Sequence, residues 1–329
     1  MLPTGAERRL ELVAGRLIRL GGAHDALSAR LVEEAGFPAV WLSGFGVSAA
    51  QFALPDVNLV TLSESVEAAR RVTASVKIPV VVDADNGFGD AMNAARAVRE
   101  YGQAGVAGVC LEDNTFPKRC SLYPGAPRQL VSVADMCAKL DAVRRAAGPY
   151  DMVIIARVES LIAGLGSEDA VTRAHAYAEA GADAILVHGR EFAPLRKIAI
   201  SAQITKPMVI VPTLFREVSF AEIAECGFAA VVCANQLLRA MLRAGQAVAK
   251  WMLRAETLAE LDPLLSTLED VNRLVHVPDD WFAEKAVAAA SSAAEPAKSK
   301  RRSCHERNGD KKPSPHSSSD HRRHHAPRR

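Results

Sequence analysis

The sequence lacks the patterns that mark several common protein classes. No apolar run approaches the roughly 20 residues that a membrane-spanning helix needs, and the N-terminus has no apolar core of a secretory signal peptide. No Gly-x-Gly-x-x-Gly motif follows the first apolar run, so a dinucleotide-binding domain is not indicated. We therefore expect a cytoplasmic protein with no membrane partner.

The cysteines form no pattern typical of a zinc site or a redox motif. None belongs to a Cys-x-x-Cys pair, and several lie inside apolar, strand-like runs; the six are Cys110, Cys120, Cys137, Cys226, Cys233 and Cys304. Buried reduced thiols of this kind are typical of a reducing compartment, which agrees with a cytoplasmic location.

Positive charge is concentrated near the C-terminus. Residues 298–329 contain 11 Lys and Arg, 3 acidic residues and five of the nine His, whereas the whole chain carries a net charge of only +2. We expect residues 1–286 to form the catalytic domain and residues 287–329 to form a disordered basic tail, because such a composition cannot bury a core. The tail could bind polyanions. An appendage without a role in catalysis is the commoner case, so nucleic acid is not an expected partner.

A short apolar run, a polar or Gly-rich turn and a helical pattern recur along the chain. The runs expected to form strands are Leu17–Leu20, Ala39–Leu42, Pro79–Val82, Val106–Leu111, Met152–Ala156, Ala184–Val187, Met208–Val211 and Ala229–Cys233. The helical patterns are Asp25–Ala35, Ser63–Ser75, Asp90–Ala104, Val133–Ala147, Glu168–Ala180, Phe220–Glu225 and Gln236–Leu253. Several of them are followed by a helix-ending glycine, namely Gly36, Gly105, Gly181 and Gly227.

Strands that alternate with helices in this way predict an α/β protein with a (β/α)8 TIM barrel. An open doubly wound sheet is the alternative, and the missing dinucleotide motif counts against it. We also expect an amphipathic helix over residues 1–16 and two extra helical segments after the last strand, Gln236–Leu253 and Leu258–Val275. Their apolar surface exceeds what one barrel needs to cover itself, so we expect a homodimer or homotetramer.

Acidic residues stand where two neighbouring apolar runs end. Val80–Val82 leads into Asp83, Asp85 and a Gly-rich turn, and the next run ends at Glu112. In a TIM barrel these strand ends share one face, and carboxylates placed there suit Mg²⁺. The alternative is a structural network in which the three acids pair with Arg157. We favour Mg²⁺, because no single strand pattern requires three acids at one rim.

Further strand ends carry groups that suit an anionic ligand. Arg157 can bind a carboxylate or phosphate with two parallel hydrogen bonds. His188, alone at its strand end, can have a structural or a catalytic role. The other polar residues at strand ends are Ser43-Gly44, Pro212-Thr213 and Asn235.

Residues 111–130 form a long polar loop after the fourth strand. Such a loop is either a lid over the barrel mouth or a plain surface connection. The groups that it would carry over a ligand are Lys118, Arg119, Cys120 and Ser121. Whether Cys120 is reactive depends on its exposure, which the sequence does not give.

These motifs together resemble the isocitrate lyase/phosphoenolpyruvate mutase superfamily, from about Gly15 to Val275. The resemblance rests on residues 41–45, 83–89, 112–113, 116–118, 156–159, 181–185 and 211–213. Within the superfamily, residues 53–58 and 156–166 resemble phosphonopyruvate hydrolases. Residues 233–235, with Leu238-Arg239, resemble the ending that these hydrolases share with phosphoenolpyruvate mutases.

The resemblance implies a Mg²⁺-dependent barrel, often tetrameric, that acts on α-keto acids through a pyruvate-like enolate. The implied metal ligands are Asp83, Asp85 and Glu112. The implied substrate-binding residues are Trp41, Ser43, Gly44, Phe45, Ser121, Arg157 and His188. The implied catalytic residues are Asp56, Lys118, Cys120, Arg157 and His188. Trp41 would pack on the substrate, and Arg157 and His188 would bind its phosphoryl group.

The loop departs from each pattern within the superfamily. Cys120 stands where the mutases have Asn, whereas Ser121 agrees with mutases and hydrolases. Lys118-Arg119-Cys120 is typical of C–C lyases such as methylisocitrate lyase, but the Gly-His that follows in the lyases is missing. We expect hydrolysis of the P–C bond of phosphonopyruvate. The alternatives are phosphoenolpyruvate mutase activity and a methylisocitrate lyase-like reaction that uses Cys120; a non-catalytic, polyanion-binding barrel is less expected because the carboxylate set is complete.

Overall fold

The computed structural model describes residues 17–121, 123 and 128–275. The chain divides into two compact units, Met1–His276 and Val277–Arg329, and every described residue belongs to the first. The helix predicted over residues 1–16, the boundary predicted between residues 286 and 287 and the basic tail all lie outside the described residues.

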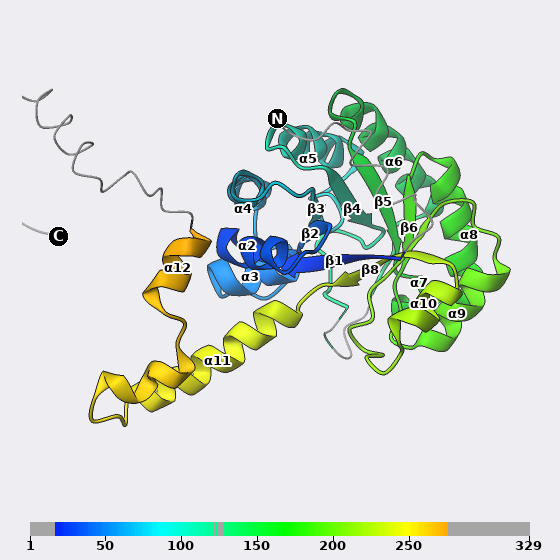
Figure 1. Cartoon of the computed structure of the whole chain (residues 1–329). Coiled ribbons are helices and arrows are strands. Elements are labelled where there is room, and N and C mark those ends of the chain that lie inside the picture. The colour runs from blue at the N-terminus through cyan, green and yellow to red at the C-terminus, as the bar shows by residue number, and fades with distance from the viewer. Residues whose placement is uncertain (1–16, 122, 124–127, 276–329) are drawn as a thin grey trace, which may run out of the picture. The chain divides into compact units, whose positions relative to one another are not determined.

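Eight parallel strands close into a barrel, in which each strand pairs with the next and β8 pairs with β1 (Figure 1). The strands are β1 Ile18–Ala23, β2 Ala39–Leu42, β3 Val80–Asp83, β4 Gly108–Glu112, β5 Val153–Val158, β6 Ala184–Val187, β7 Met208–Ile210 and β8 Phe228–Cys233. The predicted (β/α)8 fold is confirmed.

The first strand runs further than predicted. The prediction ended it at Leu20, because Gly21-Gly22 reads as a turn, but β1 continues to Ala23. A Cβ atom on Gly22 would lie 2.3 Å from the carbonyl oxygen of Ala234. Glycine at this position therefore lets β1 approach the residues that follow β8, and the barrel closes there.

Helices cover the outside of the barrel (Figure 1). They are α2 Ala26–Glu34, α3 Gly44–Phe52, α4 Leu62–Ser75, α5 Ala91–Gln103, α6 Val133–Ala147, η1 Gly148–Tyr150, α7 Ser160–Ala163, α8 Gly166–Glu179, α9 Phe192–Ser201 and α10 Phe220–Glu225. Four of them, α3, η1, α7 and α9, were not predicted. The first turn of α3 contains Gly44 and Gly46, which are poor helix formers, and α9 has Pro194 in its first turn, where proline is tolerated.

Local signals fix where the helices begin and end. Thr61 caps α4 in a capping box with Glu64, and Asp90 and Ser132 cap α5 and α6 with their side chains. The four glycines predicted to end helices all have positive φ angles: Gly36 83°, Gly105 84°, Gly181 107° and Gly227 88°.

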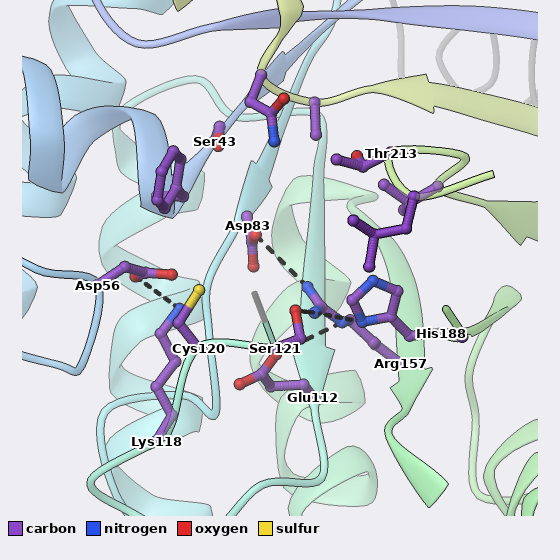
Figure 2. A pocket seen from close by; sticks show the side chains of 16 residues that line it. Ser43, Asp56, Asp83, Glu112, Lys118, Cys120, Ser121, Arg157, His188 and Thr213 are labelled. Atoms are coloured by element: carbon purple, nitrogen blue, oxygen red, sulfur yellow. Dashed lines mark hydrogen bonds and ion pairs between the residues drawn. The ribbon is translucent and has the colours of Figure 1, made fainter. Parts of the chain in front are cut away.

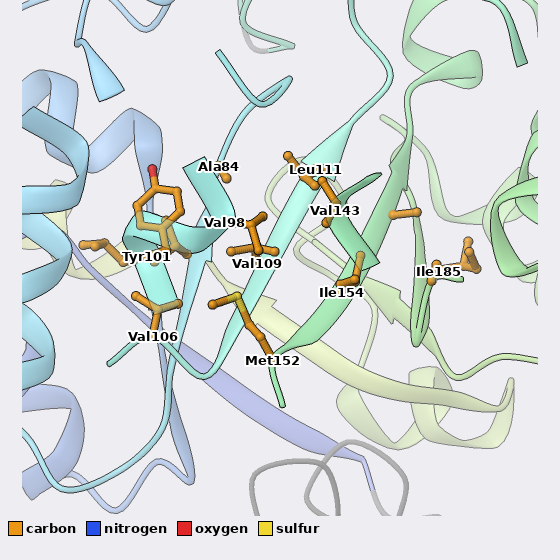
Figure 3. Close-up of a cluster of buried hydrophobic side chains, with 14 of the residues drawn as sticks. Ala84, Val98, Tyr101, Val106, Val109, Leu111, Val143, Met152, Ile154 and Ile185 are labelled. Carbon is orange, nitrogen blue, oxygen red and sulfur yellow. The ribbon is translucent and has the colours of Figure 1, made fainter. Parts of the chain in front are cut away.

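The core consists of two clusters on the two sides of the sheet. Side chains that alternate along the strands fill the barrel interior: Ile18, Leu20, Ala39, Trp41, Val81, Cys110, Val153, Ile155, Ala184, Leu186, Val209, Ala230 and Val232. The larger cluster lies between the strands and the helices; there Val109 and Ile154 pack in one layer with Val98, Tyr101 and Val143 (Figure 3). This two-sided burial makes the strand ends a rigid frame for the side chains that follow them.

The C-terminal helical segments differ from their prediction. The segment Leu258–Val275 was predicted as one helical stretch, but the structure divides it into η2 Leu258–Leu264 and α12 Leu268–Leu274. Pro263 lies in the last turn of η2, and a capping box of Thr267 with Asp270 begins α12. α11, Gln236–Met252, precedes them and has no buried residue. Within the described residues, no helix combines the length and apolar character needed to cross a membrane.

Candidate active site

A cavity of ≈ 60 Å³ opens where the strands end, and it gathers most of the predicted site residues (Figure 2). Its lining comes from the ends of β2 to β8 and from two connecting segments: Ser43, Phe45, Asp56, Asp83, Glu112, Lys118, Cys120, Ser121, Arg157, His188, Gly189, Val211, Thr213, Leu214, Ala234 and Asn235. Five candidate site residues named from the sequence do not line the cavity: Trp41, Gly44, Asp85, Arg119 and Pro212.

Trp41 lies in the barrel interior instead of beside the cavity. Its side chain is 1% exposed and belongs to the inner cluster with Val81 and Ile155. The pleat of β2 explains this position, because Trp41 points inward one residue before the strand ends at Leu42. The structure therefore gives no contact between Trp41 and the cavity.

Gly44 and Asp85 lie just behind the lining and touch one another. A Cβ atom on Gly44 would come within 2.9 Å of Asp85 Oδ1, so glycine allows the first turn of α3 to approach this carboxylate. Ser43 caps the helix by accepting a hydrogen bond from the Gly46 N–H (3.1 Å). The N–H groups at the start of a helix favour a bound anion.

Lys118 forms the cation on one side of the cavity. It is 4% exposed, and its ammonium pairs with Asp56 (2.8 Å) and with Asp85. Burial alone would lower the pKa of Lys118, but the carboxylates of Asp85 and Asp56 outweigh burial and raise it well above its usual value. Lys118 therefore stays charged at neutral pH.

Arg157 forms the cation on the other side. Its guanidinium pairs with Glu159, lies 3.5 Å from Glu112 and 3.7 Å from Asp83, and reaches Ser121 Oγ at 3.5 Å. Burial opposes its charge, yet the acids, Glu159 first, raise its pKa well above the usual range. Two of the three acids predicted as metal ligands, Asp83 and Glu112, thus pair with Arg157, as the structural alternative expected, whereas Asp85 pairs with Lys118.

His188 shares its Nδ1 atom between two partners. That nitrogen lies 2.8 Å from Arg157 Nη2 and 2.8 Å from Glu159 Oε1. Burial lowers the pKa of His188 and the charge of Arg157 lowers it further, whereas Glu159 raises it. The imidazole is therefore neutral at pH 7, and it either accepts from Arg157 or donates to Glu159.

Glu159 is a site residue that the sequence did not single out beyond its place at a strand end. It is fully buried, and its Oε2 has no hydrogen-bond partner among the described residues. Burial would raise the pKa of Glu159, but Arg157 and His188 lower it to about 2. Its N–H donates to Asp113 Oδ1 (3.0 Å), which in turn is held by Arg173 on α8. The Arg-x-Glu spacing, which puts both side chains on one face of β5, could have revealed it.

Asn235 lies at the end of another strand, as predicted. It follows β8, is 6% exposed and lines the cavity, but its side chain does not cap α11. Its Oδ1 has no hydrogen-bond partner within the described chain. A buried amide oxygen of this kind usually has a partner, so Asn235 can accept a hydrogen bond from a ligand.

The loop after β4 brings side chains into the cavity. Three of them, Lys118, Cys120 and Ser121, line the cavity and are buried. Arg190 donates to the Ser121 carbonyl (3.0 Å), and Arg128 donates to the Cys120 carbonyl (2.9 Å). This placement suits the lid alternative better than a plain surface connection.

The charge of the cavity suits a divalent cation. Five carboxylates, from Asp56, Asp83, Asp85, Glu112 and Glu159, surround the two cations. Burial raises the pKa of Asp85 well above its usual value and that of Glu112 to about 7, so further positive charge would stabilise both as carboxylates. Within the described residues, no three His, Cys, Asp or Glu side chains are already arranged around a metal position. The oxygen donors fit Mg²⁺ chemically, and Lys118 and Arg157 hold them in this structure.

The fold and the cavity thus define a TIM-barrel protein of the enzyme type, with charged side chains gathered at the carboxyl ends of its strands. The family model of phosphoenolpyruvate phosphomutase matches residues 10–253. The chain therefore belongs to the phosphoenolpyruvate mutase family, within the phosphoenolpyruvate mutase/isocitrate lyase superfamily, whose members are enzymes.

Relatives with different reactions are similar to this chain. It is 39% identical to phosphonopyruvate hydrolase of Variovorax sp. (strain Pal2) over 269 residues, which cover 81% of this chain and 92% of the relative. It is 37% identical to phosphoenolpyruvate phosphomutase of Tetrahymena pyriformis over 254 residues (77% and 84%). It is 39% identical to 2,3-dimethylmalate lyase of Eubacterium barkeri over 188 residues (57% and 64%).

Solved structures agree with the family. Phosphoenolpyruvate phosphomutase from Streptomyces platensis subsp. rosaceus superimposes with a TM-score of 0.82 at 36% identity, over 88% of this chain and 100% of that one. A phosphonopyruvate hydrolase in complex with oxalate and Mg²⁺ superimposes with a TM-score of 0.77 at 34% identity, over 89% and 99%.

Proposed function

We propose that this protein is a Mg²⁺-dependent enzyme that hydrolyses the P–C bond of phosphonopyruvate. One observation carries the proposal: a single small cavity brings together anion-binding groups, from Arg157, His188 and Ser121, and the carboxylates of Asp83 and Glu112. A substrate with a phosphonate at one end and an α-keto acid at the other matches this combination. Similarity to a phosphonopyruvate hydrolase over nearly its whole length supports the choice.

The chain's own residues divide the work. Arg157 offers planar N–H donors to phosphonate oxygens, and Ser121 adds a hydroxyl. Gly44 and Phe45 stand in the first turn of α3, and their N–H groups could bind the carboxylate and the keto oxygen, whereas the Ser43 N–H already donates to the Ala23 carbonyl (3.0 Å). Asp83, Asp85 and Glu112 would hold Mg²⁺, which when bound stabilises negative charge on the keto acid oxygen.

The reaction transfers phosphorus from carbon to water. The P–C bond breaks, its electron pair stays with the carbon as pyruvate enolate, and a P–O bond forms to water, giving phosphate. The enolate then takes up a proton and becomes pyruvate. Asp56 lies in the cavity with one oxygen on Lys118 (2.8 Å), so this pair is placed to position the water or the entering proton.

Two other reactions remain alternatives. In a phosphoenolpyruvate mutase the phosphorus would move between carbon and oxygen of the same substrate, and the loop would exclude water from the cavity. In a C–C lyase, Cys120 would donate a proton to the product enolate. The position of Cys120 in the cavity lining, 5% exposed, is the specific observation that keeps this alternative.

The test is ³¹P NMR of the protein with phosphonopyruvate and Mg²⁺. We expect the phosphonate signal to be replaced by inorganic phosphate, with pyruvate formed in equal amount. Phosphoenolpyruvate as the product would instead identify a mutase, and an unchanged spectrum would contradict both. For the lyase, cleavage of a 2-alkylmalate or methylisocitrate-type acid would have to disappear in Cys120→Ser.

We also propose that the protein works as a homodimer or homotetramer. α11 has no buried residue, and apolar side chains of the C-terminal helices are well exposed: Leu242, Trp251, Met252, Leu253, Leu258 and Leu268. So large an exposed apolar surface normally faces another subunit. Light scattering after size exclusion should give twice or four times the monomer mass, and a monomer at micromolar concentration would contradict the proposal.

A further inference from the structure

Asn58 lies where three connecting segments meet beside the cavity. It belongs to the segment between α3 and α4, and its side-chain amide contacts the turn after β3 and the loop after β4. Its Oδ1 accepts hydrogen bonds from the Lys118 N–H (2.6 Å) and from Asn86 Nδ2 (3.2 Å). Its Nδ2 donates to Asp85 Oδ2 (3.2 Å). One amide thus connects the backbone of Lys118 to the carboxylate of Asp85.

Asn86, which donates to Asn58, is itself held in place by the fold. It is fully buried, and its Nδ2 also donates to the Thr115 carbonyl (3.0 Å). The carbonyl of Asn86 accepts from the buried ammonium of Lys139 on α6 (2.6 Å). The turn after β3 is therefore tied to a barrel helix, and Asn58 transmits that restraint to the backbone at Lys118.

We propose that Asn58 is a positioning residue that holds the loop segment 114–121 over the cavity and, through the same amide, orients Asp85. Lys118 N–H docks on the Asn58 oxygen, and this contact sets where the Lys118 ammonium enters between Asp56 and Asp85. The docked segment also carries Cys120 and Ser121 into the cavity. The proposal depends on the proposed function only in taking Asp85 as a Mg²⁺ ligand.

The backbone of Asn58 makes clean substitutions available. Its φ angle is 60°, in the left-handed region that Asn, Asp and Gly tolerate. Asn58→Gly keeps this backbone conformation and removes both the side-chain acceptor and the side-chain donor. Asn58→Asp keeps an oxygen that can accept from the Lys118 N–H, but it replaces the donor to Asp85 with a second carboxylate oxygen. Leu59→Ala is the matched control, because Leu59 is the next residue and is 52% exposed.

Limited trypsin digestion, without substrate or metal, tests the hold on the loop. Arg119 is exposed next to buried Lys118, so cleavage after Arg119 reports opening of the segment when opening and closing are fast. Mass spectrometry of the fragment that ends at Arg119 separates this cut from others. Loss of one or two hydrogen bonds predicts cleavage about five-fold faster in Asn58→Gly. Asn58→Asp and Leu59→Ala should stay within about two-fold of the parent rate.

Calorimetric titration with Mg²⁺ alone tests whether Asn58 orients Asp85 for metal binding. Loss of an orienting hydrogen bond on a metal ligand predicts about ten-fold weaker Mg²⁺ binding by Asn58→Gly, with Leu59→Ala unchanged. If trypsin cleaved Asn58→Gly at the parent rate, or cleaved Asn58→Asp as fast as Asn58→Gly, Asn58 would not hold the loop at Lys118. Parent-like Mg²⁺ affinity in Asn58→Gly would overturn the role at Asp85. A parent protein that binds no Mg²⁺ would contradict the proposed function instead, while the trypsin result would stand.

Discussion

The two buried cations of the cavity are held by different parts of the molecule. Arg157 lies on β5, and its acidic partners stand at the ends of β3, β4 and β5. Lys118 lies on the loop after β4, and its partners, Asp56 and Asp85, also lie on connecting segments. Arg157 is thus a fixed charge of the barrel, whereas Lys118 is a charge that a loop delivers.

This difference suggests a division of labour. A charge built into a packed barrel can bind an anion at any time, because its geometry does not depend on a loop. A charge on a loop is in place only while the loop is closed, and loops open more readily than strands. The following variants test how far the two cations differ.

The largest effect is expected for Arg157→Lys. Lysine keeps the charge but loses the planar set of donors that contacts Glu159, Glu112 and Asp83 at once. We expect kcat/KM for phosphonopyruvate to fall about 10³-fold. Phosphate release measures it, with the exposed Arg71→Lys as control. A loss below ten-fold would mean that the fixed cation does not bind the substrate.

A smaller loss is expected for Lys118→Met. Activity should fall about 10²-fold, and the free energy of unfolding at pH 8 should fall by about 3–5 kcal/mol, because two carboxylates lose their buried partner. Urea unfolding measures the stability. Arg119→Met, which changes the exposed neighbouring cation, is the control and should change neither quantity by much. Unchanged stability would show that the Asp56 and Asp85 pairs with Lys118 are not maintained in solution.

Mg²⁺ should stabilise Lys118→Met more than the parent protein, and thermal unfolding measures this difference. A ligand that binds only the folded protein raises the unfolding temperature, by a few degrees for a 1–2 kcal/mol gain in a protein of this size. We expect a larger Mg²⁺-induced rise in Lys118→Met than in the parent, because the ammonium no longer competes for Asp85. Potassium chloride at equal ionic strength is the control. A smaller rise in the variant would contradict the competition.

The smallest effect, on the pH dependence of the free energy of unfolding, is expected for Glu159→Gln. Because Glu159 has a pKa of about 2 in the folded protein, below its value of 4.5 in the unfolded chain, its stabilising charge is present above pH 4.5 and is lost as the pH falls toward 2. The parent should therefore be more stable than Glu159→Gln at pH 6, and the difference should shrink at pH 4 and pH 3. Urea unfolding at these pH values measures it, with exposed Glu168→Gln as control; a constant difference would contradict the lowered pKa.

Much of the fold and of the site follows from local patterns in the sequence. Apolar runs that stop at Asp83, Glu112, Arg157 and His188 mark both the strands and the residues at their ends, since parallel strands all end on one face. Trp41 was predicted from the resemblance alone, and the alternation along β2 places it in the interior.

Other features depend on contacts that no local pattern contains. Asn58 meets Asn86 and Lys118 only in the folded chain. Glu159 gains its importance from Arg157 and His188, which are brought to it by two strands. The break between η2 and α12 was missed because the apolar residues of Leu258–Val275 suggested one helix, although Pro263 lies inside it.

The closure of the barrel between β1 and β8 has a consequence for biosynthesis. Ile18, at the start of the described chain, pairs with Ala230, and the cavity wall formed by Ala234 and Asn235 follows directly after β8. A ribosome-bound chain that ends before β8 has unpaired edges on β1 and β7 and lacks this wall. The cavity is therefore completed only after nearly the whole barrel has been synthesised, and a truncation before Phe228 would leave an incomplete cavity and two edges prone to aggregation.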